Sequence, residues 1–300
     1  MSAGISRLLV PVADCGGTSS GWMGRPVGGR QERFFLDRKK YPGVLLTNLH
    51  APQNTRPGCD AMIWLLFCSI ALYLFGGHKR ALFYAALAAE LAYLAVRGIA
   101  LGRLPLVGPH DTLIFFSASL ALMALPFFRA GAFRESNLFS WGAGFLAALF
   151  ALLALPFPSI AMPLPPVLKT FWFELHVALA FFAYALFGLG ALLGVLFLNC
   201  LERPLLDLQY RACLVGWSFF SASMVSGGIW GYYAWGTYWL WTPKELWTSI
   251  LWLFYAFWLH LRLKGTRWDG MVAWGGIAGF GVALFTYLGV SILMKSSHSF

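Results

Sequence analysis

The stretch GGIWGYYAWGTYWLWTPKELWTSILW, residues 227–252, organises the interpretation of the whole chain. It holds six of the fourteen tryptophans: Trp230, Trp235, Trp239, Trp241, Trp247 and Trp252. Trp and Tyr collect where a membrane meets water, because each ring has an apolar body and a polar tip. Pro243 suits the first turn of a helix, with Thr242 before it as an N-cap. The stretch therefore predicts the end of one membrane helix, an external Trp-rich segment and the start of the next helix.

The composition is that of a polytopic membrane protein. Of 300 residues, 59% are hydrophobic and 11% are charged, and the mean hydropathy is +0.68. Soluble domains carry about 25% charged residues. The formal net charge of +10 needs no nucleic acid partner, because basic residues in cytoplasmic loops orient membrane proteins.

Apolar runs predict an all-α fold with about eight transmembrane helices, each compared with the ~20 residues needed to cross a bilayer. The expected spans are residues 61–77, 80–101, 112–128, 139–157, 171–199, 212–231, 246–263 and 270–293. Lys and Arg are concentrated in alternate loops, at 77–80, 129–138, 200–211 and 261–269. The positive-inside bias assigns these loops to the cytoplasm, so that the Trp-rich segment and both termini face outward.

The first sixty residues differ from the remainder. They are polar and rich in Gly, Arg and Pro, and they contain no run long enough to span a membrane. We interpret residues 1–60 as a disordered or mis-annotated N-terminal tail, and residues 61–300 as a transmembrane domain. Eight Lys or Arg in the tail conflict with an outward N-terminus, and a start at Met62 would remove that conflict.

Histidines are the most informative polar residues of the predicted spans. His176 lies ~8 Å into the fifth span from the outside, and His298 lies just beyond the eighth span. Both are therefore expected at the level of the Trp-rich segment. His260 is expected ~21 Å below it, near the inner end of the seventh span. Each of the three could instead be structural, although ionisable residues within a bilayer are costly and typically functional.

Other polar residues have less specific interpretations. His78 is expected to be solvated in a cytoplasmic turn, and His110 is ambiguous. Glu90, inside the second span, has Arg97 as its only evident partner. The five cysteines form no C-x-x-C motif, which gives no support to a thiol–disulfide or zinc site.

Two imidazoles across a flat aromatic surface suit a bis-histidine haem, because neutral imidazole is a good ligand for iron. Trp and Tyr faces pack on a porphyrin. The outer cations Lys169, Lys244, Lys295 and Arg103 could pair with propionates or simply extend to the membrane interface.

At these residues the chain resembles the CcsA/ResC family of cytochrome c biogenesis proteins, which belongs to the WWD haem-handling superfamily. The family pattern W-G-x-Y-W-x-W-D-P-K-E-x-W is similar to residues within 227–247. Further similarity covers residues 102–116, His176-Val177 with Ala183-Tyr184, and residues 255–262, 285–290 and 297–299. The chain departs from the pattern at Thr242, where the family has Asp, and at Ala183, where it has Ser.

The resemblance implies a membrane subunit of a cytochrome c synthetase, that is, a haem lyase. It would carry haem b outward and help ligate it to the C-x-x-C-H motif of apocytochrome c, together with a CcsB/ResB-like membrane partner. His176 and His298 would be outer axial ligands of the haem iron, and His260 a transmembrane haem ligand or relay. The haem would lie against Trp230, Trp235, Trp239, Trp241 and Trp247. The expected location is the bacterial inner membrane, with this platform facing the periplasm or outside, or the thylakoid membrane if the protein is plastid.

Two alternatives remain open at this point. One is a transporter of haem or a small solute without ligation activity, in which the Trp-rich segment acts as a gate. The glycines cluster near the surface rather than at the midplane, which is unusual for such a transporter. The other is a quinol-oxidising cytochrome b subunit, which usually carries haem ligands within the spans on both sides of the membrane.

Overall fold

The computed structural model describes residues 57–75, 79–129, 136–159 and 164–293. The N-terminal segment and His298 lie outside these ranges, so the interpretations attached to them stay predictions. The longer helices are α1 (Pro57–Phe75), α2 (Arg80–Leu101), α3 (Pro109–Arg129), α4 (Ser136–Ala154), α5 (Phe171–Cys200), α6 (Arg203–Trp235), α7 (Pro243–Arg262) and α8 (Asp269–Leu284). A π-helical turn, η3 (Phe285–Gly289), joins α8 to α9 (Val290–Leu293), and two 3₁₀ turns are η1 (Pro166–Leu168) and η2 (Thr266–Trp268).

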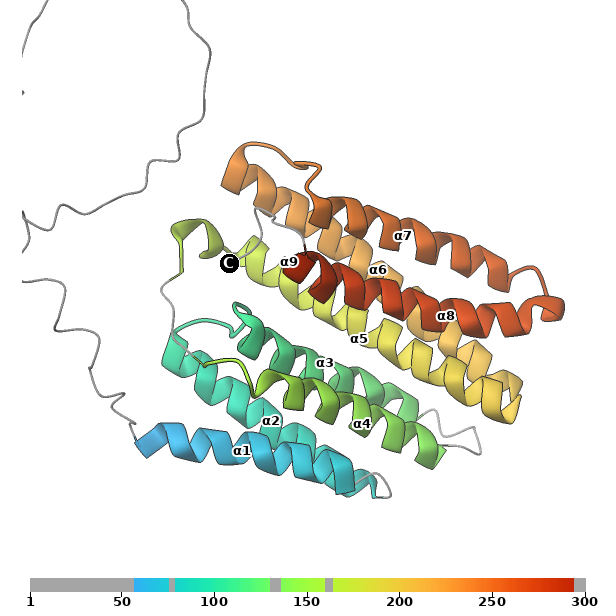
Figure 1. Cartoon of the computed structure of the whole chain (residues 1–300), viewed down its shortest axis with the longest axis horizontal. Helices are drawn as coiled ribbons and strands as arrows, with labels where there is room; N and C mark the ends of the chain where they lie inside the picture. Colours follow the sequence, from blue (N-terminus) through green and yellow to red (C-terminus); the bar gives the residue numbers. More distant parts are fainter. Residues whose placement is uncertain (1–56, 76–78, 130–135, 160–163, 294–300) are drawn as a thin grey trace, which may run out of the picture. The chain divides into compact units, whose positions relative to one another are not determined.

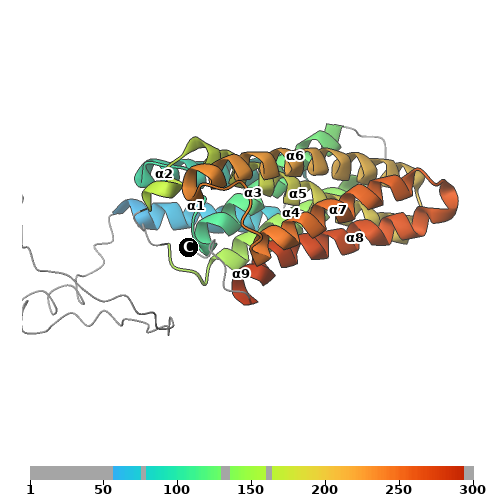
Figure 2. The ribbon, with the colours of Figure 1, turned by 90° about the horizontal axis from the view of Figure 1, so that it is seen from above.

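The helices run alternately up and down, so their connections gather at two ends (Figure 1). One end carries the loop before α3, the turn η1 and the loop at residues 236–242, and we call it the aromatic end. Helix α5 packs against α6, α8 and α3, while α7 packs against α6 and α8. Figure 2 shows α7 and α8 side by side from a second direction.

The all-α prediction is confirmed, and six of the described helices are long and apolar enough to cross a membrane. These segments are Arg80–Leu101, Pro109–Phe128, Asn137–Ala154, Phe171–Cys200, Arg203–Trp235 and Thr266–Gly289. Helix α1 contributes only the shorter apolar segment Ile63–Phe75, and α7 is not among the six. Helix α7 carries Lys244 and Glu245 in its first turn and His260 and Arg262 in its last, which lowers its hydropathy. The count of eight spans therefore stays a prediction.

Helix α6 contains the predicted span and extends more than two turns beyond its N-terminal end. Helix α6 begins at Arg203, whereas the hydropathy pattern placed the start of this span at residue 212. Pro204 in the first turn allows an early helix start, and the following polar residues continue the helix beyond the apolar run. Asp207 lies in this extension and forms an ion pair of 2.7 Å with Arg262 of α7.

Small residues allow α5 and α6 to approach closely. A Cβ atom placed on Gly190 of α5 would lie 2.6 Å from Sγ of Cys213 on α6. Close packing of this kind replaces the hydrophobic effect as the force between helices in lipid.

This contact predicts a paired stability experiment. Gly190→Ala should lower the thermal stability of the detergent-solubilised protein, because overpacking costs about 1–3 kcal/mol. Adding Cys213→Ala removes the colliding sulfur and should restore stability. Gly281→Ala is the matched control, since a Cβ there meets nothing within 4 Å. Equal melting temperatures for Gly190→Ala and Gly281→Ala would contradict the packing described.

Candidate functional site

A cavity of about 570 Å³ lies at the aromatic end, among α3, α5, α6, α7 and η3. This volume falls within the range of about 300–1,000 Å³ typical of small-molecule sites. Its lining is mainly aromatic and aliphatic, and its polar groups are few. Among the described residues it brings together five of the residues or cations that the sequence singled out: His176, Trp230, Trp235, Trp239 and Lys244.

His176 is held by helix α6 through one ring nitrogen. Its Nδ1 lies 2.8 Å from the carbonyl oxygen of Ser223 and 3.0 Å from the Ser223 hydroxyl. That hydroxyl donates in turn to the backbone carbonyl of His176, at 2.9 Å. Because a carbonyl can only accept, Nδ1 carries a proton, and in the neutral ring Nε2 keeps its lone pair. A neutral imidazole fixed in this way by a hydrogen bond on its other nitrogen is a typical metal ligand.

The absence of a side chain at Gly227 leaves room for the His176 ring. A Cβ on Gly227 would lie 2.5 Å from Nδ1 of His176, too close for any side chain. Gly228, its neighbour, faces elsewhere, since a Cβ there would meet only the carbonyl of Tyr238, at 3.5 Å. The first glycine is therefore required by the histidine and the second is not.

Trp230 forms the buried back wall of this region. Its ring lies nearly parallel to that of His176, at 11° with centroids 6.5 Å apart. Its Nε1–H donates to the carbonyl of Val167 in η1, at 2.9 Å, and its other neighbours include Phe173 and Trp235. The wall is fixed by a hydrogen bond as well as by packing, which limits its freedom to rotate.

Glu245 organises the loop that leads into α7. Its Oε2 accepts hydrogen bonds from the backbone N–H groups of Leu240 and Thr242, both at 2.9 Å. The Thr242 hydroxyl accepts in return from the Glu245 N–H, at 3.4 Å, which completes a capping box. The predicted N-cap role of Thr242, with Pro243 in the first turn, is confirmed.

Trp241, between these two clamped residues, has a left-handed backbone with φ of 56° and a side chain that is 68% exposed. Such a backbone costs a non-glycine residue about 1–2 kcal/mol. Trp241 does not line the cavity.

Trp247 does not line the cavity either. Its ring packs against Phe285 of η3, with ring centroids 4.5 Å apart.

His260, the predicted transmembrane ligand, does not line this cavity. His260 is exposed near the other end of α7, about 18 Å along the helix axis from Thr248 of the cavity. Its Nδ1 lies 2.7 Å from the carbonyl of Ala256, within its own helix. A smaller hollow of about 210 Å³ between α6 and α7 includes it. In the part of the chain that the structure describes, no three His, Cys, Asp or Glu side chains cluster as a metal site.

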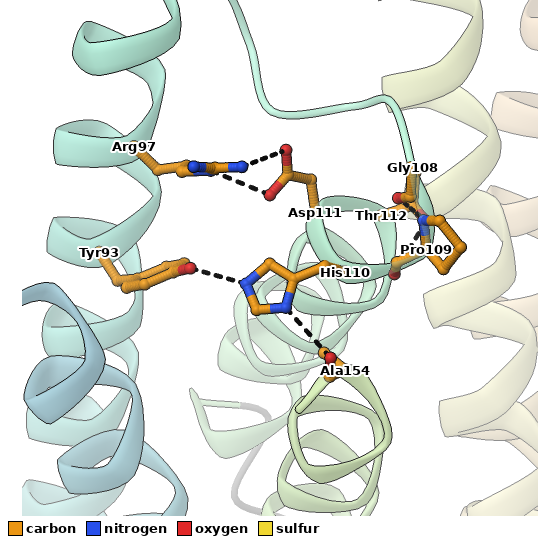
Figure 3. Close-up of polar contacts among 8 residues, drawn as sticks. All are labelled: Tyr93, Arg97, Gly108, Pro109, His110, Asp111, Thr112 and Ala154. Carbon is orange, nitrogen blue, oxygen red and sulfur yellow. Dashed lines mark hydrogen bonds and ion pairs between the residues drawn. The ribbon is translucent and has the colours of Figure 1, made fainter. Parts of the chain in front are cut away.

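His110 proves to be structural. Its Nε2 lies 2.8 Å from the hydroxyl of Tyr93 on α2, and its Nδ1 lies 3.1 Å from the carbonyl of Ala154 on α4 (Figure 3). Both ring nitrogens are therefore occupied, which leaves none for a metal. The neighbouring Asp111 forms a buried ion pair of 3.1 Å with Arg97.

These two pairs fix the first turn of α3, which is also a wall of the cavity. His110 and Asp111 are directed toward α2 and α4, while Thr112 lies on the other side of the turn (Figure 3). The Thr112 hydroxyl accepts a hydrogen bond of 2.8 Å from Tyr287 of η3, and both residues line the cavity. The polar cluster thus positions one wall of the cavity against another.

The expected pairing of Glu90 with Arg97 is wrong. Arg97 is engaged by Asp111, and Glu90 instead accepts a hydrogen bond of 2.9 Å from Tyr73 of α1. Hydropathy does not show this, because Asp111 lies just outside the apolar run at 112–128, although it is in the first turn of α3.

Several cavity residues were missed by the sequence reasoning. Ser223 belongs to no distinctive local motif. Gly227, Thr112 and Tyr287 lie in segments that resemble the family, but that resemblance does not show that they meet in one cavity. A π-helical turn is often found at functional sites, and here it carries Tyr287, but hydropathy does not reveal it.

The chain is similar to known proteins that share one family. A family model described as "Cytochrome C assembly protein" matches residues 107–298, which include the cavity-lining segments of α3, α5, α6, α7 and η3. The chain belongs to the cytochrome c assembly protein family. The predicted membership of the CcsA group is confirmed by its relatives, and the chain is an integral membrane protein.

Among the relatives, protein NrfI of Wolinella succinogenes is 34% identical over 69% of this chain and 24% of its own length. The CcsA protein of Chlamydomonas reinhardtii is 37% identical over 47% of this chain and 43% of its own length. That of Guillardia theta is 30% identical over 69% of this chain and 80% of its own. The chain thus spans less than half the length of the first two relatives.

A solved structure, named cytochrome c haem lyase CcmF, shares the fold. The TM-score is 0.58 at 18% identity, over 76% of this chain and 46% of that chain. At this identity the match supports the arrangement of helices. Family membership itself indicates a role in cytochrome c maturation.

The packing of Gly227 against His176 predicts a further paired experiment. Gly227→Ala should displace the His176 ring and reduce cytochrome c maturation by about tenfold, because the added Cβ overpacks this contact at a cost of about 1–3 kcal/mol. Gly228→Ala, one residue away, should leave maturation near the level of the unmodified protein. Maturation can be measured as covalently bound haem in a strain that lacks its own copy. Equal yields from the two variants would contradict the assigned role of Gly227.

Proposed function

We propose that the protein binds haem in the cavity at the aromatic end and helps ligate it to apocytochrome c. The observation that carries this proposal is His176, a neutral imidazole with its Nε2 lone pair available, at the wall of an aromatic cavity. The chain belongs to a family of cytochrome c assembly proteins. Because cytochrome c contains covalently bound haem, haem is the substrate that we propose.

The cavity residues fit a flat apolar ring with two acidic groups. Trp230, Trp235 and Trp239 offer aromatic faces and edges, and Lys244 supplies a half-buried cation for a propionate. Of the four outer cations considered, Lys244 is a cavity residue, whereas Lys169 is exposed. His176 would hold the iron from α5, and His298 is proposed as the second axial ligand. His260, near the other end of α7, is proposed as a transmembrane ligand on the way outward.

In ligation, the protein positions groups rather than supplying reactive ones. A thiol of apocytochrome c adds across a haem vinyl group: the sulfur bonds to one vinyl carbon and the hydrogen ends on the other. The addition is redox-neutral, and the chemistry belongs to haem and thiol. His176 keeps the ring oriented, and the walls exclude competing water. A histidine of the apocytochrome would then replace a protein ligand.

The proposed setting follows from the same arrangement. The aromatic end would face the periplasm or outside of a bacterial inner membrane, or the corresponding side of a thylakoid membrane. A CcsB/ResB-like membrane protein would be the partner, and haem b the form in transit. A transporter without ligation activity is the alternative that the experiments below distinguish.

The role of His176 predicts rescue by a small ligand. His176→Gly should lose the b-type absorption spectrum of the protein purified from membranes, because the iron loses an axial nitrogen. Added imidazole should restore the spectrum, since it fills the space left by the side chain. An unchanged spectrum in His176→Gly would exclude this residue as the ligand. Bound haem without any transfer to a C-x-x-C-H peptide would favour the transporter.

Replacing Thr242, the N-cap of α7, is expected to raise the yield of cytochrome c. Thr242→Asp restores the family's carboxylate while keeping an N-cap residue, and it should raise the yield of covalent cytochrome c. Thr242→Asn is the matched control, because it caps the helix without adding a charge. If Thr242→Asp gives no more cytochrome c than Thr242→Asn, the carboxylate has no role at this position.

A further inference from the structure

The left-handed backbone of Trp241 lies outside any helix C-cap, where this conformation is common. Leu201, the other non-glycine residue with positive φ among the described residues, is the C-cap of α5, a position where left-handed backbone is common. Trp241 instead precedes an N-cap, in a loop. Gly or Asn would adopt this conformation with less strain, yet the position carries the largest side chain. Strained residues of this kind persist where the surroundings impose them, and they gather at functional sites.

The surroundings do impose it. The Glu245 carboxylate binds the N–H on either side of Trp241, at Leu240 and at Thr242, so the loop is clamped around this one residue. The side chain is not part of the cavity lining and is 68% exposed. The clamp adjoins the cavity, because Glu245, Lys244 and Trp239 all line it. Trp241 therefore lies next to the cavity, in a loop between residues that line it.

Anchoring in the membrane interface would not need this arrangement. An interfacial Trp adjusts by rotating its side chain, and Tyr233, 70% exposed on the last turn of α6, fills such a place with ordinary helical backbone. A fixed backbone is useful where a partner must meet the ring in one orientation. Trp and Tyr are also enriched among the residues that dominate protein–protein binding.

We propose that Trp241 is a docking residue for the polypeptide that receives haem, and that it contacts an extended, thiol-bearing segment next to the cavity. The occupant follows from the position: a chain must reach the cavity to bring its thiols to a ring held by His176. This role differs from the haem contact that the resemblance implied for Trp241. It rests on the proposed function for the identity of the partner, whereas the exposed, clamped geometry is independent of it.

The test separates peptide binding from haem binding. The protein is purified in nanodiscs, and binding of a fluorescein-labelled Ser-x-x-Ser-His peptide is followed by anisotropy, so that no thioether forms. Trp241→Ala should weaken binding by about tenfold, the loss expected for an interface aromatic. Trp241→Phe should retain most of the affinity. Haem content should be the same in all variants, because the side chain lies outside the cavity lining.

Tyr233→Ala is the matched control, and it should leave peptide affinity unchanged. Equal affinity of Trp241→Ala and the unmodified protein would overturn the proposal. A second contrary result combines unchanged peptide affinity in Trp241→Ala with equal losses of membrane-inserted protein in Trp241→Ala and Tyr233→Ala. That result would indicate that Trp241 is an interfacial anchor. Absence of haem from the unmodified protein would overturn the proposed function instead, and the anisotropy comparison would still decide the role of Trp241.

Discussion

The contact between His176 of α5 and the Ser223–Gly227 segment of α6 is the constraint on which the cavity depends. One hydrogen bond from Nδ1 to the Ser223 carbonyl selects the tautomer, and the missing side chain at Gly227 leaves room for the ring. A buried imidazole without such a partner would be free to rotate or to take the other tautomer. The reactivity of Nε2 is thus determined by the packing of two helices rather than by His176 alone.

Two further sets of polar interactions fix the walls of the cavity on either side. On one side, the Arg97–Asp111 ion pair and the Tyr93–His110 hydrogen bond fix the first turn of α3, whose Thr112 meets Tyr287. On the other side, Glu245 holds the loop before α7. Buried polar groups cost free energy unless they are paired, so satisfied networks define one arrangement and oppose others. The aromatic walls lie between these two fixed elements.

Hydropathy predicted the helices well, because each needs an apolar run of nearly fixed length. It did not show the first turns of α6, where Arg203, Asp207 and Arg211 continue the helix beyond the apolar run. The pattern of Trp and His found the region of the site, and His176, Trp230, Trp235 and Trp239 do line one cavity. The sequence could not tell that Trp241 is exposed or that Trp247 packs on Phe285, because these outcomes depend on backbone torsion and long-range packing. Nor could it separate His110, with both nitrogens bonded, from His176, with one available.

The central claim is that Nε2 of His176 coordinates haem iron inside this cavity. The most direct measurement is a cryo-electron microscopy structure of the haem-loaded protein in a nanodisc. The account predicts a haem between α5, α6 and α7, with its iron bonded to Nε2 of His176 and a propionate near Lys244. A haem bound elsewhere, with this cavity filled by lipid or solvent, would contradict the account.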